Sequence, residues 1–192
     1  MGKLGFYFNM NNCIGCHTCQ IACKDKNDLP VGVNFRKVST FETGAYPTAR
    51  LYHFSGACNH CENPACVAAC PTGAMYICED GTVQHDDEIC IGCQACVKAC
   101  PYGQPALIES LGIVHKCDSC KALRDAGQNP VCVDSCLHRA IEFGDLDELR
   151  AKHAGEGLVS ELPCMPESIT NPSVVINPRE YAGEDEFYSV TL

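Results

Sequence analysis

The sequence predicts a small α+β fold made of two nested modules, in which bound metal replaces part of the apolar core. Three observations support this prediction. The chain has 192 residues and 18 cysteines, a density typical of folds held together by disulfides or metal. Sixteen of these cysteines fall into four groups of four with regular spacing. Strand-like runs of alternating apolar residues stand between the groups, beside short helical segments.

The spacing of the cysteines predicts the cofactor. The four groups are Cys13-x2-Cys16-x2-Cys19-x3-Cys23, Cys58-x2-Cys61-x4-Cys66-x3-Cys70, Cys90-x2-Cys93-x2-Cys96-x3-Cys100 and Cys117-x2-Cys120-x11-Cys132-x3-Cys136. Four thiolates hold one cubane cluster, and the first and third groups carry the iron–sulfur run Cys-x2-Cys-x2-Cys-x3-Cys. Sixteen ligands of this kind predict four [4Fe–4S] clusters.

Three other uses of the cysteines compete with this prediction. A disulfide scaffold is disfavoured because nothing marks the chain as secreted and bridged Cys-x2-Cys pairs would be strained loops. The last group taken alone also fits a four-cysteine zinc site, and that alternative stays open. Residues 13–17 match the Cys-x-x-Cys-His haem-attachment pattern, but Cys19 and Cys23 follow at once. Iron–sulfur clusters therefore explain the spacing best.

Residues 1–52 are expected to form the first half of an outer module. Phe6-Tyr7-Phe8 predicts a strand ahead of the first cysteine group. The segment 31–52 alternates enough to predict one or two further strands.

Residues 53–113 are predicted to form a complete two-cluster module, inserted into the outer one. The segments 66–71 and 96–101 are near copies, and each ends in Cys-Pro, where the proline stops a short helix. The turn Glu79-Asp80-Gly81, between two short apolar segments, predicts a hairpin in the middle of this module.

Residues 114–145 are expected to complete the outer module. Ala140-Ile141-Glu142-Phe143 predicts a strand after the fourth cysteine group, and we expect Phe6-Tyr7-Phe8 to pair with it. The outer module would thus be interrupted by the inner one.

Residues 146–192 are expected to form a helix and an irregular tail that binds a partner. Asp145 is the expected N-cap, Glu148 lies three residues on, and Gly155 is the expected stop. The tail holds four prolines and little periodicity, which leaves disorder as the alternative. Val174-Val175-Ile176 and Phe187-Tyr188 are apolar anchors that favour a partner.

The ligands are expected to be shared between groups. In two-cluster ferredoxins the fourth cysteine of each run ligates the other cluster. This rule predicts cluster 1 on Cys13, Cys16, Cys19 and Cys136; cluster 2 on Cys23, Cys117, Cys120 and Cys132; cluster 3 on Cys58, Cys61, Cys66 and Cys100; and cluster 4 on Cys70, Cys90, Cys93 and Cys96. Cys78 and Cys164 are left over and are expected to be a buried small side chain or a free thiol.

Side chains near the ligands have simpler expected roles. Gly15, Gly73 and Gly92 are expected to let the backbone approach a cluster. Four lysines lie near ligating cysteines: Lys24, Lys98, Lys116 and Lys121. Each could raise a cluster's reduction potential or bind a partner carboxylate, but a solvated side chain is the expectation for each.

Composition and motifs exclude several function classes. The net charge of −10 argues against nucleic acid as a partner. No secretory signal is visible, and no window approaches the roughly 20 apolar residues of a membrane span. There is no nucleophile–base pair, Walker loop or dinucleotide fingerprint. Since thiolates fill every ligand position, the clusters are expected to transfer electrons, and the chain to have no active site of its own.

The ligand array resembles the four-cluster iron–sulfur subunit of the molybdopterin oxidoreductases, and most of all that of the dimethyl sulfoxide reductases. The matching pieces are Cys13-x-Gly-Cys16-x-Thr-Cys19-x-x-Ala-Cys23-Lys24, Asn34-Phe35-Arg36-Lys37, Cys58-Asn-His-Cys61, Cys70-Pro-Thr-Gly-Ala-Met75, Cys90-Ile-Gly-Cys93, Cys100-Pro-Tyr-Gly103, Lys116-Cys117-Asp-Ser-Cys120 and Phe143-Gly-Asp-Leu-Asp-Glu-Leu149. The family usually has proline after the last ligand, where this chain has Leu137.

The resemblance implies an electron relay in an anaerobic respiratory complex. One end would face a molybdopterin catalytic subunit. The other would meet a membrane anchor that oxidises quinol, or a soluble donor. It allows a membrane-associated or soluble complex, either cytoplasmic or exported with a partner that carries a twin-arginine signal. An iron–sulfur redox sensor and a stand-alone polyferredoxin are the alternatives.

Overall fold

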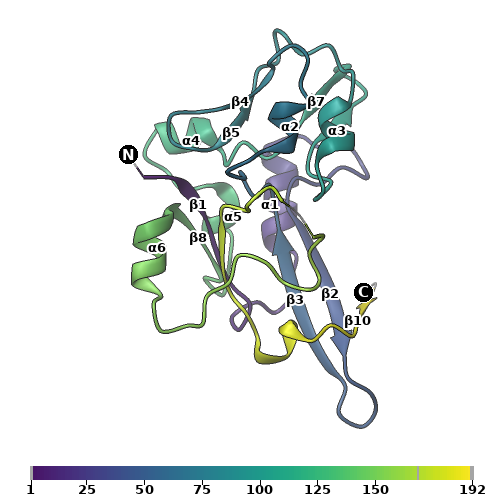
Figure 1. Ribbon diagram of the computed structural model, residues 1–192, viewed down its shortest axis with the longest axis vertical. Helices are drawn as coiled ribbons and strands as arrows, with labels where there is room; N and C mark the ends of the chain where they lie inside the picture. Colours follow the sequence, from purple (N-terminus) through teal and green to yellow (C-terminus); the bar gives the residue numbers. More distant parts are fainter. Residues whose placement is uncertain (1, 168, 191–192) are drawn as a thin grey trace.

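The computed structural model describes residues 2–167 and 169–190 (Figure 1). Its helices are α1 (Thr18–Lys26), α2 (Ala65–Ala68), α3 (Ala95–Ala99), α4 (Lys121–Asp125), α5 (Val131–Asp134), α6 (Leu146–Lys152) and the 3-10 helix η1 (Glu180–Gly183). Its strands are β1 (Leu4–Asn9), β2 (Lys37–Thr43), β3 (Arg50–Gly56), β4 (Met75–Ile77), β5 (Val83–His85), β6 (Ala106–Ile108), β7 (Ile113–His115), β8 (Ile141–Asp145), β9 (Val174–Asn177) and β10 (Phe187–Val190). The α+β class is therefore confirmed.

A three-stranded sheet joins segments that lie far apart in the sequence. Its order is β8-β1-β9, with β1 antiparallel to β8 and parallel to β9. Phe6 pairs with Phe143 and Phe8 with Ile141, so the predicted pairing of these two strands is confirmed. The strands β1 and β8 are therefore paired in the sheet, although residues 10–140 separate them in the sequence.

A second sheet extends away from the first. The strands β2 and β3 form a long antiparallel hairpin, and β10 adds to the outer side of β2. Figure 1 shows this hairpin reaching to the end of the molecule opposite the inserted segment. The one or two strands predicted within residues 31–52 are these two, with β3 continuing to Gly56.

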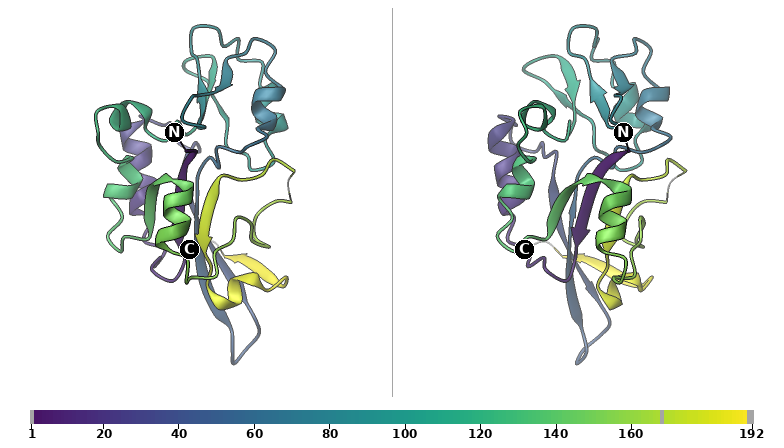
Figure 2. Two further views of the ribbon diagram at one scale, coloured as in Figure 1. Left: turned by 60° about the vertical axis from the view of Figure 1, so that its left-hand side comes forward. Right: turned by 90° about the vertical axis from the view of Figure 1, so that its left-hand side faces the viewer.

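The inserted segment gathers at one end of the molecule, as all three views in Figures 1 and 2 show. It contains the hairpin β4-β5, which was predicted, and the hairpin β6-β7, which was not. The short helices α2 and α3 pack on one another within it, as α1 and α5 do in the rest of the chain. Two similar pairs of helices therefore carry ligating cysteines: Cys66 with Cys96, and Cys19 and Cys23 with Cys132.

Cysteines make up much of the interior. The larger apolar core combines Phe6, Phe8 and Ile176 with six of the predicted ligands, and the smaller core of the inserted segment surrounds Met75 and Val83 with two more. A core that depends on thiols gains much of its stability from the metal that they bind.

The tail has a structural role that its sequence does not reveal. Val174, Val175 and Ile176 are buried in β9, beside β1, within this chain. The expectation that these three residues anchor a partner is therefore wrong, because their apolar surface is already covered. Only Tyr188 among the expected anchors is strongly exposed, at 68%; the partner-binding role of the remaining tail stays a prediction.

The helix α6 begins as predicted and ends earlier. The Asp145 carboxylate accepts hydrogen bonds from the backbone N–H groups of Asp147 at 2.9 Å and Glu148 at 3.3 Å. The helix ends at Lys152, and His153 takes the C-cap position that was expected nearer Gly155.

The N-cap gives a local prediction. Replacing Asp145 with alanine should weaken α6 by about 1 kcal/mol, because two backbone donors lose their acceptor. Amide hydrogen exchange in α6 should then accelerate by roughly fivefold. Asp147→Ala, which removes an exposed carboxylate from the same turn, is the control. Equal exchange in both variants would show that the Asp145 cap contributes nothing.

Candidate iron–sulfur cluster sites

The first cysteine group meets the last cysteine of the fourth group. Cys13, Cys16, Cys19 and Cys136 line one cavity, which is walled on one side by apolar side chains from β1, β2 and β8. These side chains are Phe8, Val38 and Ile141. The strand pairing between β1 and β8 brings the two distant segments together here.

The second and third groups exchange their last cysteines in the same way. Cys58, Cys61, Cys66 and Cys100 line a second cavity. Cys70, Cys90, Cys93 and Cys96 line a third. Each of the three cavities is therefore lined by four cysteines, one of which comes from another group.

The remaining four predicted ligands are close neighbours in the interior. The pKa of the Cys23 thiol is raised to about 11, first by burial and then by the charges of Cys132 and Cys120. Burial also raises the pKa of Cys117 well above its usual range, and the charges of Cys23, Cys58 and Cys132 add to it. The structure thus brings together the cysteines predicted for cluster 2, next to the cysteines predicted for cluster 3.

Burial makes these thiols poor acids until a metal compensates. The pKa of Cys66 is raised to about 12, chiefly by burial. The thiolate is the form that binds metal, and an unpaired buried anion is costly. An iron cluster supplies the positive charge that stabilises four converging thiolates, so the donor sets fit [4Fe–4S] clusters.

The backbone of the first and third groups repeats. Gly15 and Gly92 adopt left-handed conformations, with φ of 69° and 65°, and the residues two positions on, His17 and Gln94, do the same at 59° and 60°. A Cβ atom on Gly92 would lie 2.2 Å from the Gly112 carbonyl oxygen. Glycine is therefore required where the loop turns tightly around its cavity.

Two basic residues near these sites are buried. Lys116 is 5% exposed, so the expectation that it is solvated is wrong. Arg36, which belongs to the Asn34-Phe35-Arg36-Lys37 motif but received no role from its sequence, is 2% exposed. In the sequence, only Lys116 of the two stands next to a cysteine. Arg36 comes close to the thiols only in the folded chain.

Comparisons with known proteins agree with these sites. Residues 49–146 match the family model of a 4Fe-4S dicluster domain, and residues 10–28 match a 4Fe-4S binding domain. The chain is 42% identical over 191 residues to the B subunit of the anaerobic dimethyl sulfoxide reductase of Haemophilus influenzae, covering 95% of this chain and 92% of that protein.

The chain belongs to the family of the anaerobic dimethyl sulfoxide reductase B subunits. It is 43% identical to the B subunit of Escherichia coli over 185 residues, covering 92% of this chain and 89% of that protein. It is also 44% identical over 140 residues to the thiosulfate reductase electron transfer subunit of Salmonella typhi, covering 71% and 72%. The predicted family and the predicted [4Fe–4S] cofactors are confirmed.

Within residues 2–167 and 169–190, every helix is too short or too polar to cross a membrane.

Proposed function

We propose that this chain relays electrons through four [4Fe–4S] clusters between an electron donor and the molybdopterin catalytic subunit of an anaerobic reductase. The observation that carries the proposal is the convergence of sixteen cysteines into four sets of four. Relatives named as reductase B subunits and as an electron transfer subunit support it. These names favour a reductase of the dimethyl sulfoxide type as the catalytic partner.

The proposed ligand sets follow the ferredoxin rule that the fourth cysteine of each group ligates the other cluster of its module. Clusters 1 to 4 would be held by the four sets predicted above, each completed by a cysteine from another group. The chain then forms two nested ferredoxin-like modules, with residues 53–113 inserted between residues 1–52 and 114–145. The cavities of clusters 1, 3 and 4 and the neighbouring thiols of cluster 2 support this arrangement.

We infer an order for the four sets from the interactions between neighbouring sets. The charge of Cys132, which belongs to set 2, raises the pKa of Cys19 in set 1 and of Cys23 in set 2. The charge of Cys58 in set 3 likewise raises the pKa of Cys117 in set 2. Sets 3 and 4 are joined where α2 packs on α3. The order 1-2-3-4 is therefore the proposed electron path.

The chain's residues hold and insulate the clusters. A [4Fe–4S] cluster with four thiolate ligands supplies one-electron transfer. Hydrogen bonds aimed at ligand sulfurs, such as the Ala140 N–H to Cys136 Sγ at 3.2 Å and the Ser119 N–H to Cys117 Sγ at 3.4 Å, stabilise the anionic form. Apolar side chains around each cavity exclude water. Since each set uses four cysteines, no ligand position is left for substrate, and we assign catalysis to the partner.

The two ends of the row are open to partners. Of the sixteen ligands, all of which the structure describes, only Cys16 in set 1 and Cys93 in set 4 are exposed. Ile14 lines the cavity beside Cys16 and Ile91 the one beside Cys93, and both are strongly exposed. Apolar contact there would cover the terminal clusters in the complex. Assembly with a membrane anchor or a soluble donor, and export with a twin-arginine partner, stay predictions.

Iron content tests the proposal in the purified complex. Elemental analysis should give about 16 iron atoms per chain, from four irons in each cluster. The cluster EPR signals of the dithionite-reduced complex should disappear when dimethyl sulfoxide is added. About 8 irons per chain would show that one of the two modules holds no clusters. Clusters that stay reduced with dimethyl sulfoxide, thiosulfate and related acceptors would contradict the relay.

A further inference from the structure

Two buried cations lie where neighbouring cysteine sets meet. Arg36 and Lys116 are 2% and 5% exposed. Among the described residues, neither forms an ion pair with a carboxylate; their hydrogen bonds go to carbonyl oxygens and to one hydroxyl. A buried charge without a counter-charge is costly. The anions that compensate these cations must therefore be the thiolates and the clusters they hold.

Arg36 touches sets 1 and 2. Its Nη1 donates to the carbonyl oxygen of Ser55 at 3.0 Å and to Ser55 Oγ at 3.1 Å. Ser55 Oγ lies 3.4 Å from Sγ of Cys19 in set 1. The charge of Arg36 also stabilises the thiolate of Cys23 in set 2. The Phe6 ring covers the guanidinium, with its centroid 4.7 Å from Cζ, so water does not screen this charge.

Lys116 touches sets 2 and 3. It precedes Cys117 of set 2, and its Nζ donates to the Cys117 carbonyl oxygen at 2.9 Å and to the carbonyl oxygen of Val83. The same side chain lines the cavity of Cys58, Cys61, Cys66 and Cys100. Its charge stabilises the Cys66 thiolate of set 3.

We propose that Arg36 and Lys116 are tuning residues that raise the reduction potentials of clusters 1, 2 and 3. The inference rests on the proposed function for its cluster sites. Reduction adds negative charge to a cluster that is already anionic, and a nearby cation in a low-dielectric interior favours this step. Cluster 4 has no comparable buried cation among the described residues, since Lys98 beside its ligands is exposed. Clusters 1 to 3 are thereby made more reducible than cluster 4 at the other end of the row.

A redox titration of the purified complex, followed by EPR, tests this inference. Lys116→Gln keeps a hydrogen-bond donor but removes the charge, and Lys116→Arg keeps the charge. In Lys116→Gln we expect the ratio of reduced to oxidised cluster 3 at a fixed potential to fall by about tenfold, or about 59 mV for one electron. Cluster 2 should shift in the same direction, while clusters 1 and 4 stay unchanged.

Controls separate tuning from a structural role. Lys98→Gln should leave all four potentials unchanged, because water screens an exposed charge. Arg36→Gln should lower the potentials of clusters 1 and 2 only. An unchanged cluster 3 potential in Lys116→Gln, with about 16 irons still bound as expected for four clusters, would overturn the tuning role while leaving the relay intact. Iron loss in Lys116→Gln and Arg36→Gln, with full iron in Lys116→Arg, would show that the buried cations are needed for cluster assembly. That result would also overturn the tuning role.

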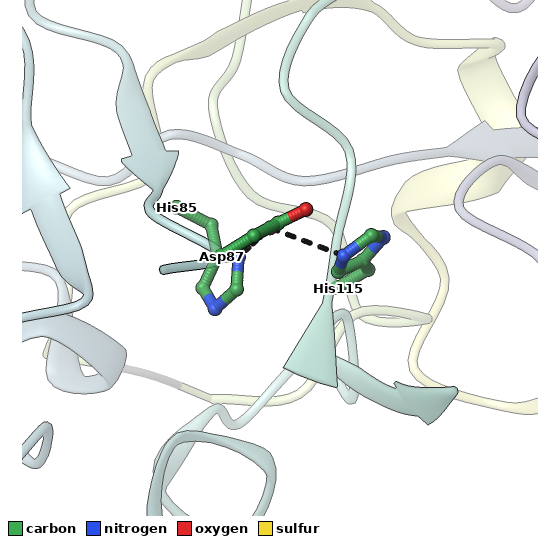
Figure 3. A group of neighbouring side chains, drawn as sticks. All are labelled: His85, Asp87 and His115. Atoms are coloured by element: carbon green, nitrogen blue, oxygen red, sulfur yellow. Dashed lines mark hydrogen bonds and ion pairs between the residues drawn. The ribbon is translucent and has the colours of Figure 1, made fainter. Parts of the chain in front are cut away.

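A second, independent observation concerns His85, Asp87 and His115, at the ends of β5 and β7. One donor atom of each lies within 4.8 Å of the others. Figure 3 shows the Asp87 carboxylate between the two imidazole rings. Asp87 Oδ1 is 2.8 Å from His85 Nδ1 and 3.1 Å from His115 Nε2. Beyond this contact with Asp87, the buried Nε2 atom of His115 has no hydrogen-bond partner among the described residues, and the buried Nε2 atom of His85 has none there either.

We infer that these three side chains form a site for a divalent transition metal such as Zn²⁺. Two imidazoles and one carboxylate are a common zinc donor set, completed by water. Zinc bonds of about 2.0–2.2 Å require donor atoms roughly 3.3 Å apart, which small movements of the present side chains provide. Asp87 is 59% exposed on its side chain, so the metal has a path from solvent. His85 also lines the cavity of cluster 4, which places the bound charge near the end of the row.

Zinc binding to the iron-loaded complex tests the site. Equilibrium dialysis with Zn²⁺ should add one zinc per complex relative to Asp87→Asn, with at least tenfold weaker binding in that variant. Glu88→Gln, an exposed neighbour, is the control and should bind as the unmodified chain does. X-ray absorption should show nitrogen and oxygen ligands near about 2.0–2.1 Å. Sulfur ligands near about 2.3 Å, or equal binding in Asp87→Asn, would overturn the site.

Discussion

A Cys70→Ser variant is expected to change the EPR spectrum of cluster 4 and to leave that of cluster 3 intact. Cys70 follows Cys66 by only four residues, yet it lines the cavity of Cys90, Cys93 and Cys96. Loss of one thiolate leaves an iron with a poorer ligand, so cluster 4 should lose an iron or disappear. The effect is large, since about a quarter of the reduced-cluster EPR intensity belongs to this site if the four clusters contribute equally.

The matched control is Cys78→Ser. Cys78 lies outside all four cysteine sets, in the groove that contains Asp80 and Arg124, and its loss should leave every cluster signal unchanged. A change confined to cluster 3 in Cys70→Ser would contradict ligand sharing. Cys70 would then ligate the same cluster as Cys58, Cys61 and Cys66, the other cysteines of its own group.

An Ile176→Asp variant is expected to destroy the sheet that aligns the two outer segments. Ile176 is fully buried in β9 and pairs with Phe8 of β1. An unpaired carboxylate there should cost about 4 kcal/mol or more, a value reached only by severe core changes. Phe8 also lines the cavity of cluster 1, so clusters 1 and 2 should be lost and iron should fall by about half.

The same substitution at Tyr188 separates core from surface. Tyr188 lies in β10 of the same tail and is 68% exposed, so Tyr188→Asp should keep the full iron content. If Ile176→Asp also kept its iron and its thermal stability, β9 would not be part of the core that supports clusters 1 and 2.

Much of the fold could be predicted because the cysteine spacing is strict and local. The β4-β5 hairpin, the pairing of β1 with β8 and the Asp145 cap depend on short patterns or on the nesting that the ligands imply. The tail strand β9 could not be predicted, because a parallel pair with β1 forms between segments more than 160 residues apart and leaves no local signal. The proline-rich composition around it pointed toward an irregular partner-binding segment instead.

The surroundings of the sites were predicted less well than the ligands. Sequence adjacency marked Lys116 but could not show that the β5 backbone and the cluster 3 cavity enclose it. Arg36 is 13 residues from the nearest cysteine, Cys23, in the sequence, and the fold brings it to Cys19 of set 1 through Ser55. Burial of a charge is a property of tertiary packing, which single-sequence patterns do not encode.

The most direct test is the iron anomalous difference map of the crystallised complex. Four cubane peaks are expected in a row, with the first joined to Cys13, Cys16, Cys19 and Cys136 and the last to Cys70, Cys90, Cys93 and Cys96. Four peaks each bound by one contiguous group, such as Cys13 to Cys23, would contradict the nested arrangement. Fewer than four peaks would contradict the four-cluster relay itself.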